Sequence, residues 1–223
     1  MSDAPVLTIL GAGRAGTALA RAAASAGMDV RIAASRPPAA LRLHLAQYAP
    51  RATAVAAADV AAADVAAPLV VLMVPQEDLD SVDPAWLRGA VLVDATNRWD
   101  GEPVPAWLES GLDAGLSSSS VLATRFAGST VVKALNHVSH WDLDTAGRRL
   151  DPADPDRRGL GVAADSAQAA AAVGQLVLGL GFAPVFLPDL AAGRVLEPEG
   201  PVFNRPVSGP ELARLTGGTV GRD

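Results

Sequence analysis

A short hydrophobic run that ends in a glycine-rich turn is the feature that most narrows the folds open to this chain. Residues 6–10 read VLTIL, and residues 11–16 read GAGRAG. The Ala- and Leu-rich residues 15–26 are typical of a helix, and residues 29–35 form a second hydrophobic run. This succession of strand, turn, helix and strand predicts a βαβ unit that binds the pyrophosphate of a dinucleotide.

Each glycine of the turn serves this purpose for a different physical reason. Gly11 permits the tight turn, Gly13 lets the backbone approach the pyrophosphate, and Gly16 allows close packing of the helix on the sheet. The pyrophosphate then meets the helix N-terminus, where free N–H groups favour an anion. We therefore predict that the whole turn contacts the cofactor: Gly11, Ala12, Gly13, Arg14, Ala15 and Gly16.

The end of the second hydrophobic run indicates which dinucleotide is bound. An NAD site places Asp or Glu about 20 residues past the glycines, where the carboxylate accepts hydrogen bonds from the ribose. Here Ser35 and Arg36 occupy that place, and neither is acidic. A hydroxyl beside a guanidinium suits a 2′-phosphate, so the pair predicts NADP.

Composition excludes several other functions. The net charge of −6 and the pI near 5.0 oppose binding to nucleic acid or to an anionic membrane surface, so small molecules are the expected partners. The chain has no cysteine, which excludes disulfides, thiolate metal sites and a cysteine nucleophile. No apolar stretch is long enough for a membrane span and no signal peptide is evident, so we expect a cytoplasmic protein.

Hydrophobic runs alternate with helical segments along most of the chain, which predicts a parallel sheet. We expect an α/β fold, a Rossmann-type doubly wound parallel sheet with a small C-terminal α/β appendage, in a single compact unit. Residues 1–136 would form the NADP-binding core, residues 137–215 an extension that packs on the core and closes the cleft, and residues 216–223 a tail. The expected strands cover residues 6–10, 29–35, 52–55, 68–75, 89–94, 129–135, 159–164 and 182–187, and the expected helices cover 15–26, the segment holding Leu41 to Leu45, 116–126, 167–180 and 211–215. Residues 137–150 read as a loop and 151–158 as an exposed turn.

Ligands of such sheets bind outside the carboxyl ends of the strands. Three pairs of residues lie just past predicted strand ends, and we expect them at the site: Val74 and Pro75, Thr96 and Asn97, and Asn136 and His137. Of these, Val74, Pro75, Thr96, Asn97 and Asn136 are predicted to contact the cofactor. Asn136 and His137 are the candidate catalytic residues, because either could orient a ring.

Two other clusters have simpler explanations. His137, His140, Asp142 and Asp144 look like metal ligands, but one His pair in an unassigned loop is a weak signal, and we predict no metal site. The run of serines at 117–120 lacks a glycine elbow and a His–Asp pair, so helix capping explains it better than nucleophilic catalysis. His44 reads as a residue on a helix surface.

The chain resembles the deazaflavin (coenzyme F420)-dependent NADP reductase family, which is related to the N-terminal domain of pyrroline-carboxylate reductase and to the cytosolic domains of metalloreductases. The segments that carry the resemblance span most of the chain: 9–16, 34–36, 74–75, 93–97, 131–136, 180–182 and 194–198. The resemblance implies hydride transfer between NADPH and a deazaflavin stacked in one cleft, and it suggests a dimer. Little acid–base machinery would then be needed, because the hydride chemistry belongs to the cofactors.

The chain departs from the family pattern at Ala164-Asp165-Ser166 and at residues 186–190. The family has a Gly-Asp-Asp turn at the first place, and its segment at the second helps to form the deazaflavin side of the cleft. Two alternatives therefore stay open: an NADPH-dependent reductase of a small carbonyl or imine, with His137 as the best proton donor, and a module that senses NADP(H) without turnover.

Overall fold

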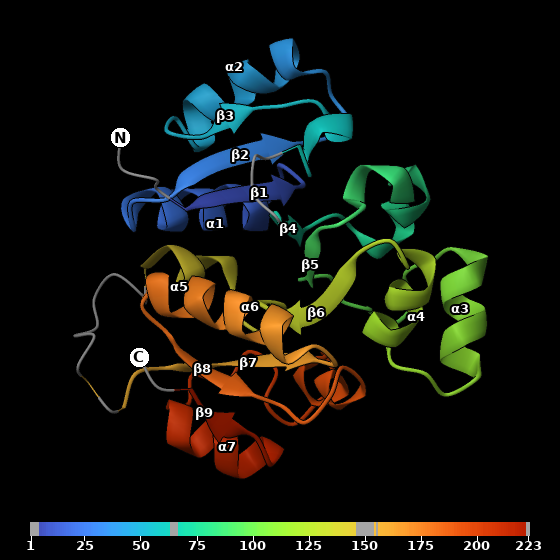
Figure 1. The fold of residues 1–223 in the computed structure, drawn as a ribbon, viewed down its shortest axis with the longest axis vertical. Helices are drawn as coiled ribbons and strands as arrows, with labels where there is room; N and C mark the ends of the chain where they lie inside the picture. The colour runs from blue at the N-terminus through green and yellow to red at the C-terminus, as the bar shows by residue number, and fades with distance from the viewer. Residues whose placement is uncertain (1–4, 63–66, 146–153, 155, 222–223) are drawn as a thin grey trace.

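The computed structural model describes residues 5–62, 67–145, 154 and 156–221 (Figure 1). Within them, strands form one nine-stranded sheet, and helices follow most strands. The strands are β1 (Val6–Leu10), β2 (Asp29–Ala33), β3 (Thr53–Ala54), β4 (Leu69–Leu72), β5 (Val91–Asp94), β6 (Thr130–Ala134), β7 (Gly159–Ala164), β8 (Ala183–Phe186) and β9 (Thr219–Val220). The α-helices are α1 (Arg14–Ser25), α2 (Pro38–Tyr48), α3 (Ala106–Asp113), α4 (Ser118–Arg125), α5 (His140–Thr145), α6 (Ala167–Gly179) and α7 (Gly209–Thr216).

The strand order is β3-β2-β1-β4-β5-β6-β7-β8-β9. Neighbouring strands run parallel except β6 with β7 and β8 with β9. The order reverses at β1, which lies between β2 and β4, and this is the switch point at which doubly wound sheets bind ligands. The predicted Rossmann-type fold is therefore confirmed, with an antiparallel strand where the C-terminal part begins.

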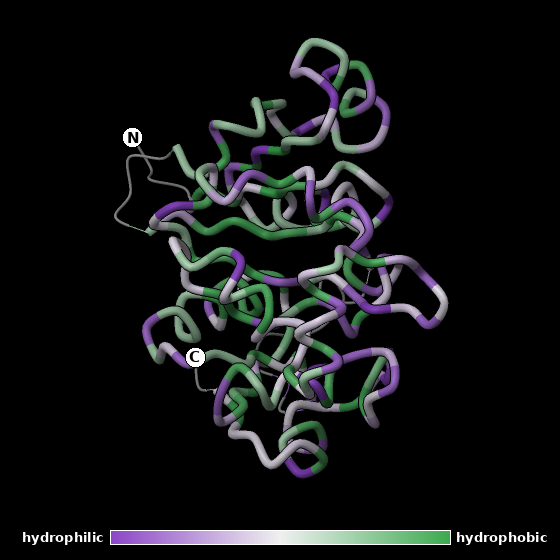
Figure 2. Tube along the Cα trace, turned by 90° about the vertical axis from the view of Figure 1, so that its right-hand side faces the viewer, coloured by the Kyte–Doolittle hydropathy of each residue, from purple (hydrophilic) through white to green (hydrophobic). Residues whose placement is uncertain are grey.

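Two layers cover the sheet. One face packs on α1, α2, α5 and α6, and its core is the larger cluster of Val, Leu, Ile and Ala side chains. The other face packs on α3, α4 and the 3₁₀ helices η1 (Ala57–Asp59), η2 (Gln76–Ser81) and η3 (Pro84–Leu87). A third cluster joins β7 and β8 to α7 and to η5 (Ala191–Leu196). Hydrophobic residues run along the middle of the molecule in Figure 2, as expected of strands buried on both faces.

Capping residues explain several helix starts. Ser166 and Ser208 accept hydrogen bonds from the backbone N–H groups of Ala169 and Glu211, and they begin α6 and α7. Ser117 does the same for Ser120 at the start of α4, as the capping interpretation of the serine run predicts. Gly217, with φ of 69°, ends α7 in the left-handed conformation that glycine tolerates best.

The C-terminal half is more regular than the sequence suggests. The segment read as a loop after residue 136 contains α5, whose Leu143 is buried, and the expected tail contains β9, which pairs with β8. Helix α3 was not predicted. Of the expected exposed turn, residues 151–153 and 155 lie outside the described residues, but Arg158 is only 8% exposed because it pairs with Asp142. The division at residue 136 stays a prediction.

Candidate functional site

The glycine turn has the geometry that a dinucleotide needs. Gly11 has φ of 127°, and a Cβ there would collide with the backbone carbonyl of Met73 at the end of β4. A Cβ on Gly16 would collide with the carbonyl oxygen of Gly11, so this glycine lets α1 lie against the turn. A Cβ on Gly13 would meet no atom within 4 Å. Two glycines are therefore required by packing, and the third faces open space.

That open space belongs to a cavity of about 550 Å³, which we call the glycine-turn cavity. It lies outside the ends of β1, β2 and β4, and Gly11, Ala12 and Gly13 form part of its wall. Ser35 and Arg36 line it, and the Arg36 guanidinium makes no hydrogen bond or ion pair with the residues that the structure describes. The remaining lining residues are Leu10, Ala34, Ala57, Met73, Val74, Pro75, Asp78, Ser81, Val82 and Trp86.

His44 supports this cavity from α2. Its Nε2 lies 2.9 Å from the carbonyl oxygen of Ala12, and its ring packs on Tyr48. A carbonyl only accepts hydrogen bonds, so Nε2 carries the proton and donates. His44 is half-buried on α2, and its side chain also links this helix to the glycine turn.

The ends of β5 and β6 are joined by a pair of amides. The Asn97 side-chain nitrogen donates to the Asn136 carbonyl oxygen at 2.9 Å, and the Asn136 side-chain nitrogen donates to Asn97 Oδ1 at 3.0 Å. Asn136 also donates to the carbonyl oxygen of Leu196, at the end of η5. Leu135 has φ of 64°, a strained conformation that redirects the chain at this point. The structure thus brings together the Asn97 and Asn136 predicted for the site.

A buried ion pair lies beneath the amides. Lys133 Nζ is 3.2 Å from Asp94 Oδ2 and donates to the Thr96 carbonyl oxygen at 2.8 Å, and both charged side chains are fully buried. Asp94 also accepts from the Thr96 hydroxyl and from Ser119. Opposite charges in neighbouring strands signal such a pair, but the sequence interpretation assigned no role to Asp94 or Lys133 and treated Ser119 only as part of a helix-capping serine run.

This network determines which way the Gln76 amide points. The Thr96 hydroxyl donates to Asp94, so it must accept from the Gln76 side-chain nitrogen, 3.0 Å away. Gln76 Oε1 is then an acceptor, and like Asn136 Oδ1 it is buried and has no partner among the described residues. An unpaired buried acceptor costs about 1–3 kcal/mol. Each of these two oxygens could accept a further hydrogen bond.

His137 is placed differently from its neighbour Asn136. It is buried, and its Nε2 accepts a hydrogen bond from the Gly161 N–H of β7 at 3.1 Å. Burial, and secondarily the charges of Arg158 and Lys133, lower the pKa of His137 to about 3. His137 lines neither of the two large cavities. Its side chain contacts β7 and not the candidate site.

Because its folded pKa lies far below the ordinary 6.5, His137 makes folding pH-dependent. The unfolded chain takes up a proton on this histidine as pH falls through 6.5, and the folded chain does not until about pH 3, so stability is lost in between. Between about pH 7.5 and pH 5 this loss is about 2 kcal/mol. Denaturant unfolding measures the free energy of unfolding at both pH values, and its change between them should be smaller for His137→Gln than for the wild type. An equal change in the two proteins would contradict the assignment.

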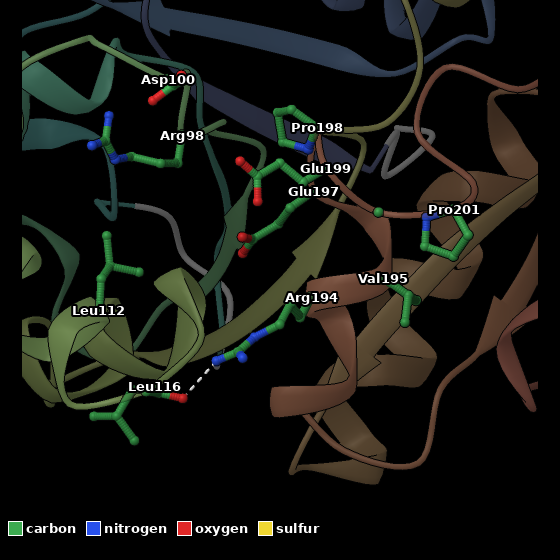
Figure 3. Close-up of a pocket in the computed structure, with 12 residues that line it drawn as sticks. Arg98, Asp100, Leu112, Leu116, Arg194, Val195, Glu197, Pro198, Glu199 and Pro201 are labelled. Carbon is green, nitrogen blue, oxygen red and sulfur yellow. Dashed lines mark hydrogen bonds between the residues drawn. The ribbon is translucent and has the colours of Figure 1, made fainter.

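A second cavity, also of about 550 Å³, is drawn with its lining side chains in Figure 3. We call it the Glu197 cavity, because that carboxylate points into it. Arg98 follows Asn97 and Glu197 follows Leu196, so the cavity adjoins the amide pair on two sides. Arg194 donates to the Gly115 carbonyl oxygen across one wall. The remaining lining residues are Asp100, Leu112, Leu116, Val195, Pro198, Glu199, Gly200 and Pro201.

The two segments that depart from the family pattern lie elsewhere. Ala164 pairs with Val132 in the middle of β6, and because β7 runs antiparallel to β6 the chain after Ala164 runs toward the amino end of β6. Phe186 pairs with Val162 of β7 and leads in the same direction, and the Leu190 N–H donates to Asp165. Residues 164–166 and 186–190 line neither the glycine-turn cavity nor the Glu197 cavity.

Comparison with known proteins agrees with this architecture. Residues 6–98 match the family described as NADP oxidoreductase, coenzyme F420-dependent. The resemblance predicted from the sequence is thereby confirmed. A proposed F420-dependent NADP reductase of Arthrobacter sp. FB24 is 26% identical, with a TM-score of 0.64 over 84% of this chain and 86% of that one. A hypothetical protein of Sinorhizobium meliloti is 28% identical, with a TM-score of 0.74 over 92% and 95% of the two chains.

Other relatives extend the comparison. The metalloreductase STEAP3 of Rattus norvegicus is 29% identical over 199 residues, which is 87% of this chain but 36% of that protein. The chain thus spans about a third of that relative. An imine reductase from Pseudomonas sp. shares the fold, with a TM-score of 0.56 at 18% identity. Together with the family match, these findings support an NADP-dependent oxidoreductase with a dinucleotide-binding Rossmann fold.

Most residues predicted for the site gather along one edge of the sheet. Gly11, Ala12 and Gly13 line the first cavity together with Ser35, Arg36, Val74 and Pro75, whereas Arg14, Ala15 and Gly16 do not. Thr96, Asn97 and Asn136 line neither cavity, and hydrogen bonds join Thr96 to Gln76 and Asn97 to Asn136. Among the described residues no helix is long and apolar enough to cross a membrane, and no group of three or more acidic or histidine side chains could hold a metal ion. Sequence reasoning missed Gln76, Ser118 and Glu197, whose importance comes from contacts between distant segments.

Proposed function

We propose that this protein transfers a hydride between NADPH and a second cofactor of the deazaflavin type. The observation that carries the proposal is the pair of similar cavities along one carboxyl edge, with the Asn97–Asn136 amides between them. Each volume lies within the range of small-molecule sites. A dinucleotide that starts at the glycine turn and extends along this edge would bring its reactive ring to the amide pair, facing the Glu197 cavity.

The residues present fit NADP. Gly13 leaves room for the pyrophosphate, and Ser35 suits the 2′-phosphate together with Arg36, which has no partner among the described residues. Gln76 Oε1 and Asn136 Oδ1 are acceptors without partners, and the nicotinamide carboxamide carries matching donors. NADPH, when bound, supplies the hydride. The chain's own task is to hold two rings in line and to exclude water, and the buried pair Asp94 and Lys133 keeps the orienting amides in place.

Steady-state assays with NADPH and purified deazaflavin test the proposal. Oxidation of NADPH that depends on deazaflavin supports it. Oxidation only with small imines or carbonyls would establish the alternative reductase, and tight NADPH binding without turnover by any of these would establish a sensing module. A homodimer and a cytoplasmic location, expected from the resemblance and the sequence, belong to the same proposal, and sedimentation measures the first.

The choice of NADP over NAD is tested at Arg36. Arg36→Ala should weaken NADPH binding by about 10- to 100-fold, which corresponds to about 1.5–3 kcal/mol for a charge-assisted hydrogen bond. NADH binding should hardly change, because it has no 2′-phosphate. Fluorescence titration measures both affinities. Arg42→Ala, an exposed arginine of α2 outside the cavity wall, is the matched control. Equal losses for NADPH and NADH would contradict the assignment.

A further inference from the structure

The Glu197 cavity holds one carboxylate that the fold positions more firmly than the rest. Glu197 Oε1 accepts a hydrogen bond of 2.6 Å from the Ser118 hydroxyl, and Ser118 is completely buried at the start of α4. The backbone next to it is anchored as well, because the preceding carbonyl, that of Leu196, accepts from Asn136. Glu197 is therefore held from two sides at the point where the cavity meets the amide pair.

The chemistry of the proposed function leaves a proton unaccounted for. A hydride carries two electrons and one proton, so the balanced reaction is NADPH plus acceptor plus H⁺ giving NADP⁺ plus reduced acceptor. The C–H bond at C4 of the nicotinamide breaks and a C–H bond forms on the acceptor. A neighbouring acceptor atom gains the electron pair and must take a proton, whether the acceptor is a deazaflavin ring, an imine or a carbonyl. A positioned acid accelerates such a step by about 10²- to 10⁴-fold.

Few groups around the cavity can provide this proton. Arg98 and Arg194 stay protonated, so they orient and stabilise charge without donating a proton. The three carboxylates are Asp100, Glu197 and Glu199. Asp100 and Glu199 are exposed, and only Glu197 is half-buried and bonded to another side chain. His137, the donor considered from sequence, does not border the cavity.

We propose that Glu197, oriented by Ser118, is the proton donor of this site. This inference rests on the proposed function. This role requires Glu197 to carry a proton when the acceptor is bound. As the hydride arrives, the O–H bond of Glu197 breaks, the proton joins the acceptor atom that gains the electron pair, and solvent then reprotonates the carboxylate. In the reverse direction Glu197 is the base. Ser118 is a positioning residue, and the charged groups that share the cavity with Glu197 are Arg98, Asp100, Arg194 and Glu199.

Single-turnover kinetics of the full chain test this role. Glu197→Gln, which keeps the shape and can still bond to Ser118, should slow hydride transfer by about 100-fold or more while NADPH affinity stays within about twofold. The pH–rate profile of Glu197→Gln should also lack an ionisation that the wild type shows. In Ser118→Ala the same ionisation should remain but occur at a different pH. Glu102→Gln, an exposed residue outside the cavity wall, is the matched control and should behave as wild type.

A binding measurement supplies a readout that does not depend on turnover. Calorimetry of oxidised deazaflavin binding, in two buffers of different ionisation enthalpy, should show uptake of about one proton near pH 7 by the wild type and none by Glu197→Gln. Unchanged rate and unchanged proton uptake in Glu197→Gln would overturn the role, as would a larger loss in Glu199→Gln. If the wild type reduces only an imine or carbonyl, the proposed function is refuted but the role of Glu197 is not. That role is then tested by measuring the same variants with the imine or carbonyl as acceptor. A wild type that reduces none of the three refutes both.

Discussion

The Gly13→Val substitution is expected to abolish dinucleotide binding while the chain still folds. A Cβ at position 13 meets no protein atom within 4 Å, so the folded chain can accommodate the new side chain. The same side chain projects at the wall of the glycine-turn cavity, where the pyrophosphate must approach the backbone. Fluorescence titration should therefore detect no NADPH binding at concentrations that saturate the wild type, and the thermal unfolding midpoint should stay within a few degrees.

The neighbouring glycines provide the contrast. Gly16→Ala places a Cβ against the carbonyl oxygen of Gly11, and Gly11→Ala places one against Met73 in a backbone conformation that disfavours side chains. Both substitutions should lower the unfolding midpoint, and any loss of binding would accompany the loss of folding. If Gly13→Val retained NADPH affinity, the turn would have no role in binding. If it unfolded the chain, the division between packing and binding glycines would be wrong.

This division also marks how far the sequence could predict the site. The spacing of Gly11, Gly13 and Gly16 after a hydrophobic run is a local pattern, so it predicted the strand, the turn and the helix together. Ser35 was readable for the same reason, since its distance from the glycines is a local count. Gly11, Gly13 and Ser35 line one cavity because parallel strands bring their carboxyl ends to a common edge.

The rest of the site depends on contacts between segments far apart in the chain. Ser118 and Glu197 are 79 residues apart, and nothing in the sequence pairs a helix-capping serine with that carboxylate. β7 runs antiparallel to β6 and β8 runs parallel to β7, so the chain after Phe186 runs away from the carboxyl end of β6, a direction that no local pattern indicates. His137 was nominated because it follows a strand end, but its ring accepts from Gly161 of the next strand. Position along a strand was predictable, whereas the partner across the sheet was not.

Lys133→Met is expected to cost about 3–5 kcal/mol of unfolding free energy, because it leaves the Asp94 carboxylate buried without its counter-charge. The stem of Lys133 packs against Gly193 of η5, and a methionine side chain keeps most of this apolar stem. The loss of stability therefore comes from the missing charge and not from a missing side-chain volume. Denaturant unfolding measures this loss, provided that the dependence of the unfolding free energy on denaturant concentration is the same in both proteins. Arg214→Met breaks an exposed ion pair with Glu211 and should alter stability little.

The double variant Asp94→Asn, Lys133→Met separates the charge from the hydrogen bonds. An asparagine can still accept from Thr96, so removing the stranded charge should recover part of the lost stability, and the double variant should be more stable than Lys133→Met alone. Because Thr96 in turn orients Gln76, NADPH affinity should follow the same order among the folded variants. Equal stability of the single and double variants would mean that the Asp94 charge is neutralised without Lys133, and the ion pair would then not hold the ends of β5 and β6 in place.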